Sequence, residues 1–80
     1  MDKKNIEKKV KEVLEERLEI KNVTIDSHLV NDLGMDSFNM VELLYEIEDS
    51  FEIDISEEEM QNISTVREVV DYIYNKLLEK

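Results

Sequence analysis

The chain has 80 residues, no cysteine and a formal net charge of −11. This length predicts one domain spanning residues 1–80, and the absence of cysteine excludes a disulfide scaffold and thiolate metal sites. Nucleic-acid binding requires a basic surface, so nucleic acid is not expected as a partner. The N-terminal residues carry mixed charge without an apolar run. We therefore expect a cytoplasmic monomer with neither a signal peptide nor membrane insertion.

The charges are distributed unevenly along the chain. Five lysines lie within the first eleven residues, whereas no Lys or Arg occurs from Asn22 to Val66. The same span contains twelve carboxylates, from Asp26 to Glu59. A solvated surface retained for solubility would account for such a run. Its strict single sign nevertheless favours a docking face for basic partners.

The first helical pattern covers residues 3–18, where apolar residues recur at three- and four-residue steps and indicate one buried stripe. The residues of this stripe are Ile6, Val10, Val13, Leu14 and Leu18. Residues 19–36 follow without a clean period. Because no partner strand is evident, we expect a long ordered loop between the first two helices, with a turn of helix near Ser27 to Val30. Its apolar anchors are Val23, Ile25, Leu29, Val30 and Leu33.

The second predicted helix covers residues 37–51 and begins with Asp36 or Ser37 as its N-cap. The only glycine, Gly34, lies just before it and permits a backbone conformation or a close approach that a side chain would block. The inward-facing stripe is Met40, Leu43 or Leu44, Ile47 and Phe51. A second line runs from Ser37 through Val41, Tyr45 and Glu48. Its flanking carboxylates indicate an acidic exposed side.

Two capping-box patterns predict the remaining helices. Ser56 precedes Glu59 by three residues, and Thr65 precedes Glu68 by three. They predict a short helix over residues 57–62 and a fourth helix over residues 66–78. The fold class is therefore all-α, a small bundle of three main helices plus one short helix.

Ser37 is the residue that most invites a chemical role. The only histidine, His28, lies in the loop, and the flanking glycines of a nucleophile elbow are missing, so we expect no catalytic residue. Asp32, Gly34 and Asp36 lack the remaining ligands of an EF-hand, so we expect no dedicated metal site. A phosphate ester on a serine at a helix N-terminus is favoured electrostatically. The residues alone leave open whether Ser37 is modified or only caps the helix.

The segment Gly34-Met35-Asp36-Ser37-Phe38, followed by Val41-Glu42-Leu43, resembles the prosthetic-group motif of acyl carrier proteins. In that family the motif reads G-x-D-S-L, with V-E-L shortly after it. Further segments that match the family pattern are Asp32-Leu33-Gly34, Glu46-Ile47-Glu48, Phe51-Glu52-Ile53, Glu57-Glu58-Glu59, Ile63-Ser64-Thr65-Val66 and Val70-Asp71-Tyr72-Ile73. The resemblance covers nearly the whole chain and is to free-standing, type II members.

The resemblance implies a carrier rather than an enzyme. Ser37 would accept 4'-phosphopantetheine from coenzyme A, and the thiol of that arm would carry an acyl group as a thioester. Asp36 would contact the phosphopantetheinyl transferase or its metal. Positions implied to dock basic patches of acyl-chain synthesis and acyl-transfer enzymes are Val41, Glu42, Tyr45, Glu48 and Asp49. Positions implied to lie near an acyl pocket are Leu43, Ile47, Ile55, Met60 and Ile63.

Two departures from the family pattern bear on the pathway. Phe38 replaces the leucine that follows the serine, and Ser56 replaces the proline usual before the third helix. The expected pathway is fatty-acid or related synthesis. Phe38 keeps open a dedicated carrier for a polyketide, a specialised lipid or an aminoacyl group. An acidic adaptor or nucleic-acid mimic with an unmodified Ser37 is the alternative from another class.

Overall fold

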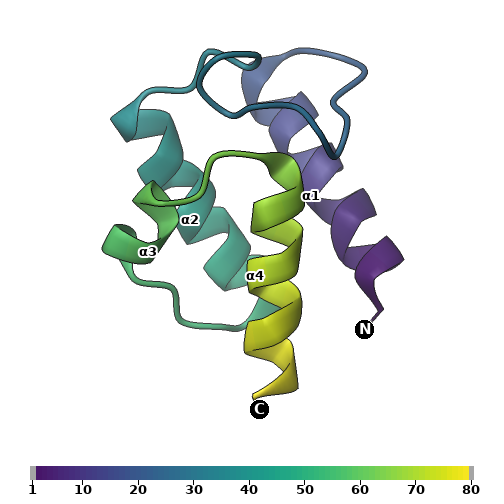
Figure 1. The fold of residues 1–80 in the computed structure, drawn as a ribbon, viewed down its shortest axis with the longest axis vertical. Coiled ribbons are helices and arrows are strands. Elements are labelled where there is room, and N and C mark those ends of the chain that lie inside the picture. The colour runs from purple at the N-terminus through teal and green to yellow at the C-terminus, as the bar shows by residue number, and fades with distance from the viewer. Residues whose placement is uncertain (1, 80) are drawn as a thin grey trace.

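A computed structural model describes residues 2–79 as four helices without a strand (Figure 1). Figure 1 shows α1 beside α4, with the two helices running in opposite directions, and the short α3 beside α2. The predicted all-α bundle is confirmed, and only the third helix differs, ending one residue earlier than expected. The helices are α1 (Lys3–Leu18), α2 (Ser37–Phe51), α3 (Glu57–Gln61) and α4 (Val66–Leu78).

Each helix begins after a side chain that accepts the backbone N–H three residues ahead, which satisfies one of the unpaired donors of the first turn. The N-cap residues are Asp2, Asp36, Ser56 and Thr65. At Thr65 the predicted capping box is complete, because the Glu68 carboxylate also accepts the Thr65 N–H at 3.2 Å. At Ser56 only half of the box forms within the described residues: the hydroxyl accepts the Glu59 N–H at 3.0 Å.

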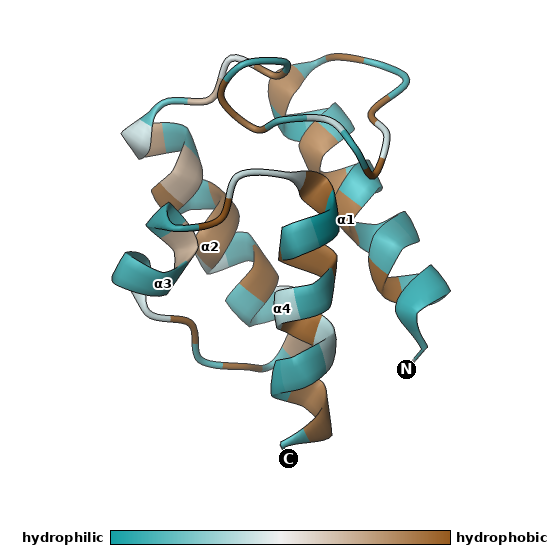
Figure 2. Cartoon of the chain, viewed as in Figure 1, coloured by the Kyte–Doolittle hydropathy of each residue, from teal (hydrophilic) through white to brown (hydrophobic). Residues whose placement is uncertain are grey.

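Apolar stripes from the three long helices meet in one core. Figure 2 shows hydrophobic and hydrophilic segments alternating along each of these helices, so that each helix has a hydrophobic side to bury. The stripes predicted for α1 and α2 are confirmed, with Leu18 at the margin as a partly buried residue. A further stripe comes from α4, where Leu77 is a partly buried residue. Both Leu43 and Leu44 are buried, so the inward face of α2 is wider than a single row. The fully buried helical side chains include Ile6, Val10, Leu14, Leu43, Val66, Val69 and Ile73.

The long loop between α1 and α2 is fixed against the start of α4. Three backbone hydrogen bonds join residues 25–29 to residues 64–67, and the Arg67 guanidinium pairs with the Asp26 carboxylate at 2.7 Å. Nothing in the sequence indicated this junction. Its only β-type pairing among the described residues is an isolated bridge between His28 and Thr65. The bonds run from Leu29 N to Ser64 O (2.8 Å), from Val66 N to Ser27 O (3.1 Å) and from Arg67 N to Ile25 O (2.8 Å).

Most of the predicted loop anchors lie inward. Val23 and Leu29 are buried, whereas Ile25 and Leu33 are half-buried. Val30 was wrongly assigned to this set, since 53% of its surface is exposed. Met35, which was not predicted as an anchor, is 3% exposed and takes an inward position just before α2.

The turn of helix expected near Ser27 to Val30 is not formed as a helix. The loop instead makes a hydrogen-bonded turn over residues 29–33, in which the Asp32 N–H donates to His28 O at 2.9 Å. The ring of His28 accepts the backbone N–H groups of Val30 and Asn31 at its Nδ1 atom, at 3.2 and 3.0 Å. The Asp32 carboxylate in turn accepts the His28 N–H at 2.6 Å. This reciprocal arrangement resembles a helix cap, and it requires an Nδ1 atom without a proton. His28 is therefore a structural residue of the turn that leads to α2.

We predict that His28→Ala destabilises the protein by about 1 kcal/mol, the usual cost of losing a capping acceptor. His28→Asn keeps an acceptor at nearly the same place, so it should retain most of the stability. The measurement is urea unfolding of both variants and the parent protein. Equal destabilisation by alanine and asparagine would show that the ring contributes through packing rather than as an acceptor.

Tyr72 of α4 has a buried hydroxyl with no hydrogen-bond partner among the described residues. Its ring lies under the Lys76 ammonium, 5.6 Å from Nζ to the ring centroid. Burial, together with the nearby Glu59 carboxylate on α3, raises the pKa of Tyr72 to about 12. The neutral phenol is therefore the form that the fold favours.

Tyr72→Phe should leave the protein at least as stable at neutral pH, because it removes a buried polar atom that lacks a partner. The parent protein should also lose stability relative to the variant at alkaline pH. Tyrosine in the unfolded chain ionises near pH 10. The raised folded-state pKa therefore gives a stabilisation that is complete below that pH and lost as the pH rises through about 12. Urea unfolding of both proteins at neutral and alkaline pH measures this, and parallel pH profiles would refute it.

Candidate functional site

Asp36, and not Ser37, is the N-cap of α2. The Asp36 Oδ1 atom accepts the Asn39 N–H at 2.9 Å, and the Asn39 side chain accepts the Asp36 N–H at 3.2 Å. This complete capping box leaves Ser37 as the first residue of the helix, with an exposed side chain. The Ser37 hydroxyl makes no hydrogen bond to any described residue. The alternative in which Ser37 serves as the N-cap is therefore wrong.

Gly34 sets the direction of the chain as it approaches this serine. Its φ angle is +71°, in the left-handed region that side chains disfavour. A Cβ atom at this position would meet nothing within 4 Å, so the glycine is required for its conformation rather than for a close approach. Backbone hydrogen bonds from Gly34 N to Val30 O and from Met35 N to Leu29 O, both 3.0 Å, hold the segment in place.

The surroundings of Ser37 suit a phosphate ester. The N–H groups of Ser37 and Phe38 belong to the first turn of α2 and have no intrahelical acceptor. The first turn contains no acidic residue, and the helix dipole places partial positive charge there. An anion on the Ser37 hydroxyl would therefore lie near free donors, although its neighbour Asp36 also carries a negative charge at the helix cap.

A depression of about 510 Å³ opens beside Ser37, between the loop, the start of α2 and the end of α3. Its lining is Val30, Met35, Asp36, Ser37, Met40, Gln61 and Ile63. Of the residues predicted for an acyl pocket, only Ile63 lines this depression. Leu43, Ile47, Ile55 and Met60 instead belong to the buried core, each 7% exposed or less.

The residues predicted for docking lie on α2, but they differ in exposure. Tyr45 is 57% exposed and Asp49 is exposed, whereas Val41 is half-buried. Phe38, directly after the serine, is 69% exposed and therefore presents a large aromatic surface to solvent. This side of α2 combines apolar and acidic side chains.

Several acidic side chains of this face are engaged within the molecule. Arg17, at the end of α1, contacts Glu46 at 2.6 Å and Glu42 at 3.3 Å. The Glu48 carboxylate accepts the Ile55 N–H at 2.9 Å, which fixes the connection that follows α2. Sequence reasoning missed Arg17, because no local pattern relates it to a residue 29 positions away.

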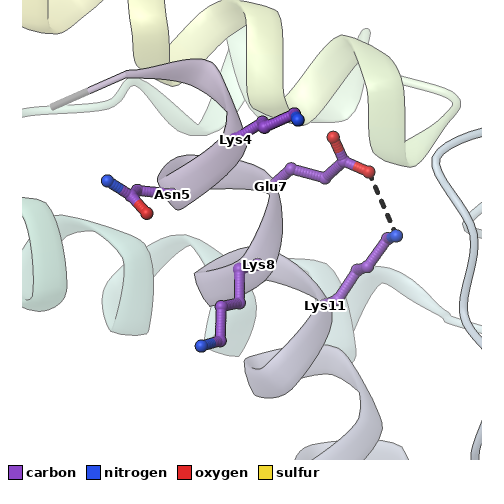
Figure 3. Close-up of a pocket in the computed structure, with 5 residues that line it drawn as sticks. All are labelled: Lys4, Asn5, Glu7, Lys8 and Lys11. Atoms are coloured by element: carbon purple, nitrogen blue, oxygen red, sulfur yellow. Dashed lines mark ion pairs between the residues drawn. The ribbon is translucent and has the colours of Figure 1, made fainter.

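A second depression, of about 440 Å³, lies on α1 (Figure 3). Its lining is positively charged, whereas the only charged residue beside Ser37 in the first depression is Asp36. The residues that line the second depression are Lys4, Asn5, Glu7, Lys8 and Lys11. Figure 3 shows them all on one helix, with Glu7 paired to Lys11 at 3.0 Å. The lining contains no hydroxyl or thiol that could accept a group, so the candidate site remains at Ser37. Within residues 2–79 there is neither a cluster of acidic or histidine side chains suited to a metal ion nor a helix that could cross a membrane.

Comparison with known proteins places this chain in a defined class. Residues 8–73 match the family described as "Phosphopantetheine attachment site". An acyl carrier protein from Buchnera aphidicola (subspecies Acyrthosiphon pisum, strain 5A) is 44% identical over 96% of this chain and 99% of its own. One from Cyanidium caldarium is 45% identical over 98% and 93%. The crystal structure of an acyl carrier protein from Thermotoga maritima superposes with a TM-score of 0.83 at 28% identity, covering 99% of this chain and 94% of that one.

The class is that of proteins that carry a phosphopantetheine group. The chain belongs to the acyl carrier protein family. Its cofactor is therefore 4'-phosphopantetheine, and its role is to carry acyl groups as thioesters, in agreement with the resemblance found in the sequence. The exposed Ser37 at the start of α2 fits such a group.

The uneven charge of the chain gives a prediction about its stability. Self-repulsion within residues 22–66 should weaken when salt screens it. Raising the ionic strength from about 0.01 M to about 0.15 M shortens the Debye length from about 30 Å to about 8 Å. We expect the melting temperature to rise over this range and to rise further with millimolar magnesium. Thermal unfolding followed by circular dichroism measures this, and a melting temperature indifferent to both additions would contradict it.

Proposed function

We propose that residues 1–80 act as one carrier domain and that Ser37 is the residue that bears the phosphopantetheine arm. The observation that carries this proposal is a serine hydroxyl that is exposed, makes no hydrogen bond within the described chain and lies within the family motif at a helix start. The arm supplies a thiol that holds the acyl group as a thioester. Ser37 supplies the oxygen that joins the arm to the protein as a phosphodiester.

Asp36 would serve the transfer of the arm as well as the fold. One carboxylate oxygen, Oδ1, caps α2, while no described residue donates a hydrogen bond to Oδ2. The capping box holds the Asp36 side chain in place and thereby fixes the position of Oδ2. We propose that it contacts the phosphopantetheinyl transferase or the metal ion of that enzyme.

The exposed side of α2 would receive partner enzymes. We propose that Val41, Tyr45 and Asp49 contact their basic docking patches directly, with Glu42 and Glu48 adding to the negative potential around them. An acidic surface of this kind increases the association rate with basic partners and makes it depend on ionic strength. Weak docking of this type suits a carrier, because it must leave each enzyme after delivering its acyl group.

The depression beside Ser37 would be the entrance for an acyl chain. Its lining includes the flexible, polarisable side chains of Met35 and Met40, which adapt readily to an irregular ligand. We propose that a chain enters past Ile63 and extends toward the remaining pocket residues by separating α2 from α3. Those residues are Leu43, Ile47, Ile55 and Met60.

We propose fatty-acid or related synthesis as the pathway, with one observation in favour of a more specialised carrier. Phe38 stands next to the attachment serine, where most of its surface is exposed, and the family motif has leucine there. A bulkier aromatic residue at this point changes the surface that every partner meets when it reaches the arm. A dedicated carrier for a polyketide, specialised lipid or aminoacyl group is therefore the second candidate.

The test is modification of the purified chain by a phosphopantetheinyl transferase with coenzyme A, followed by intact mass spectrometry. We expect the parent protein to gain one phosphopantetheine group and Ser37→Ala to gain none. Ser50→Ala removes an exposed hydroxyl from the same helix and should be modified like the parent. The proposal fails if the parent is not modified, or if Ser37→Ala gains the same mass.

A further inference from the structure

Arg17 reaches across from α1 to two carboxylates of α2. Its Nε atom lies 2.6 Å from Glu46 Oε2, and its Nη1 atom lies 3.3 Å from Glu42 Oε1. Glu42 and Glu46 are four residues apart on the helix, at a spacing where like charges repel each other. The planar guanidinium suits such a pair because its donors form a rigid fork.

Glu42 is one of the residues proposed for docking on α2, and Glu46 lies about one turn further along the same helix. Both carboxylates belong to α2, and residues 22–66 contain neither lysine nor arginine. The positive charge therefore comes from the preceding helix. With Arg17 in place, the three side chains carry a net charge of −1 rather than the −2 of the two carboxylates alone.

We propose that Arg17 is an intramolecular competitor for the cations of partner enzymes and thereby limits the affinity of docking at Glu42 and Glu46. A lysine or arginine of a partner must either displace Arg17 or bind a pair whose charge is half neutralised. The side chains of all three residues are only about one-third exposed, at 32% for Arg17, 36% for Glu42 and 39% for Glu46, so the pair is accessible to a partner but already occupied. This inference rests on the proposed docking function of α2.

The proposal has a consequence that a purely structural ion pair does not share. If Arg17 only joined α1 to α2, its loss would loosen the fold and weaken binding or leave it unchanged. If Arg17 competes with partners, its loss strengthens binding. The gain should also disappear at high ionic strength, because screening removes the attraction between exposed charges.

The experiment measures the KM of a basic phosphopantetheinyl transferase for the unmodified protein at low ionic strength. We expect Arg17→Gln to lower the KM by about three- to tenfold with little change in kcat, since about one unit of competing charge near the surface is removed. Lys21→Gln is the matched control: it makes the same change in net charge at an exposed residue that forms no ion pair with the described residues. Its KM should stay close to that of the parent.

Arg17→Lys provides a second variant that keeps the charge but loses the fork, and its KM should lie between those of the parent and Arg17→Gln. Circular dichroism at the assay temperature checks that each variant is folded. If Arg17→Gln is not folded, the KM of Arg17→Lys is compared with that of the parent instead. Equal KM values for Arg17→Gln and Lys21→Gln, or a raised KM for both Arg17 variants, would overturn the proposal while leaving Ser37 modification intact. Failure of the parent to be modified would overturn the proposed function and this inference together.

Discussion

The position of the proposed attachment site depends on the backbone junction between residues 25–29 and residues 64–67. The loop that precedes α2 has no regular structure, and ordering so long a segment carries a large entropic penalty. Three backbone hydrogen bonds to the start of α4, together with the buried side chain of Leu29, offset part of that penalty. The same loop supplies Val30 and Met35 to the depression beside Ser37. A change at the start of α4 would therefore alter the surroundings of a serine nearly 30 positions earlier in the chain.

The order of Asp36 and Ser37 resolves a conflict between capping and exposure. Aspartate and serine are both favourable N-cap residues, and a capping side chain is held by a backbone N–H. If the serine occupied that position, its hydroxyl would be engaged by the helix. With Asp36 as the cap, the serine moves one residue into the helix, where its hydroxyl is exposed and near unpaired N–H groups. Gly34 makes this placement possible through its left-handed conformation.

The helices could be predicted from the sequence almost to the residue, because local signals determine them. Apolar periodicity identifies the buried faces, and capping residues such as Thr65 mark the helix starts. The path of the loop could not be predicted, since its backbone hydrogen bonds to α4 leave no mark on residue type. For the same reason Val30 and Met35 could not be assigned correctly as exposed and buried. Ser37 emerged from its motif, but its free hydroxyl became evident only from the capping geometry.

The acidic face of α2 illustrates why a count of carboxylates overstates its attraction for partners. Arg17 occupies Glu42 and Glu46, and the Ile55 N–H engages Glu48. These contacts stabilise a surface whose single sign would otherwise oppose folding. Each of them also reduces the charge that a partner can use. Stability and docking therefore compete for the same carboxylates. Carboxylates that remain exposed to solvent, such as that of Asp49, should influence binding more than their share of the net charge suggests.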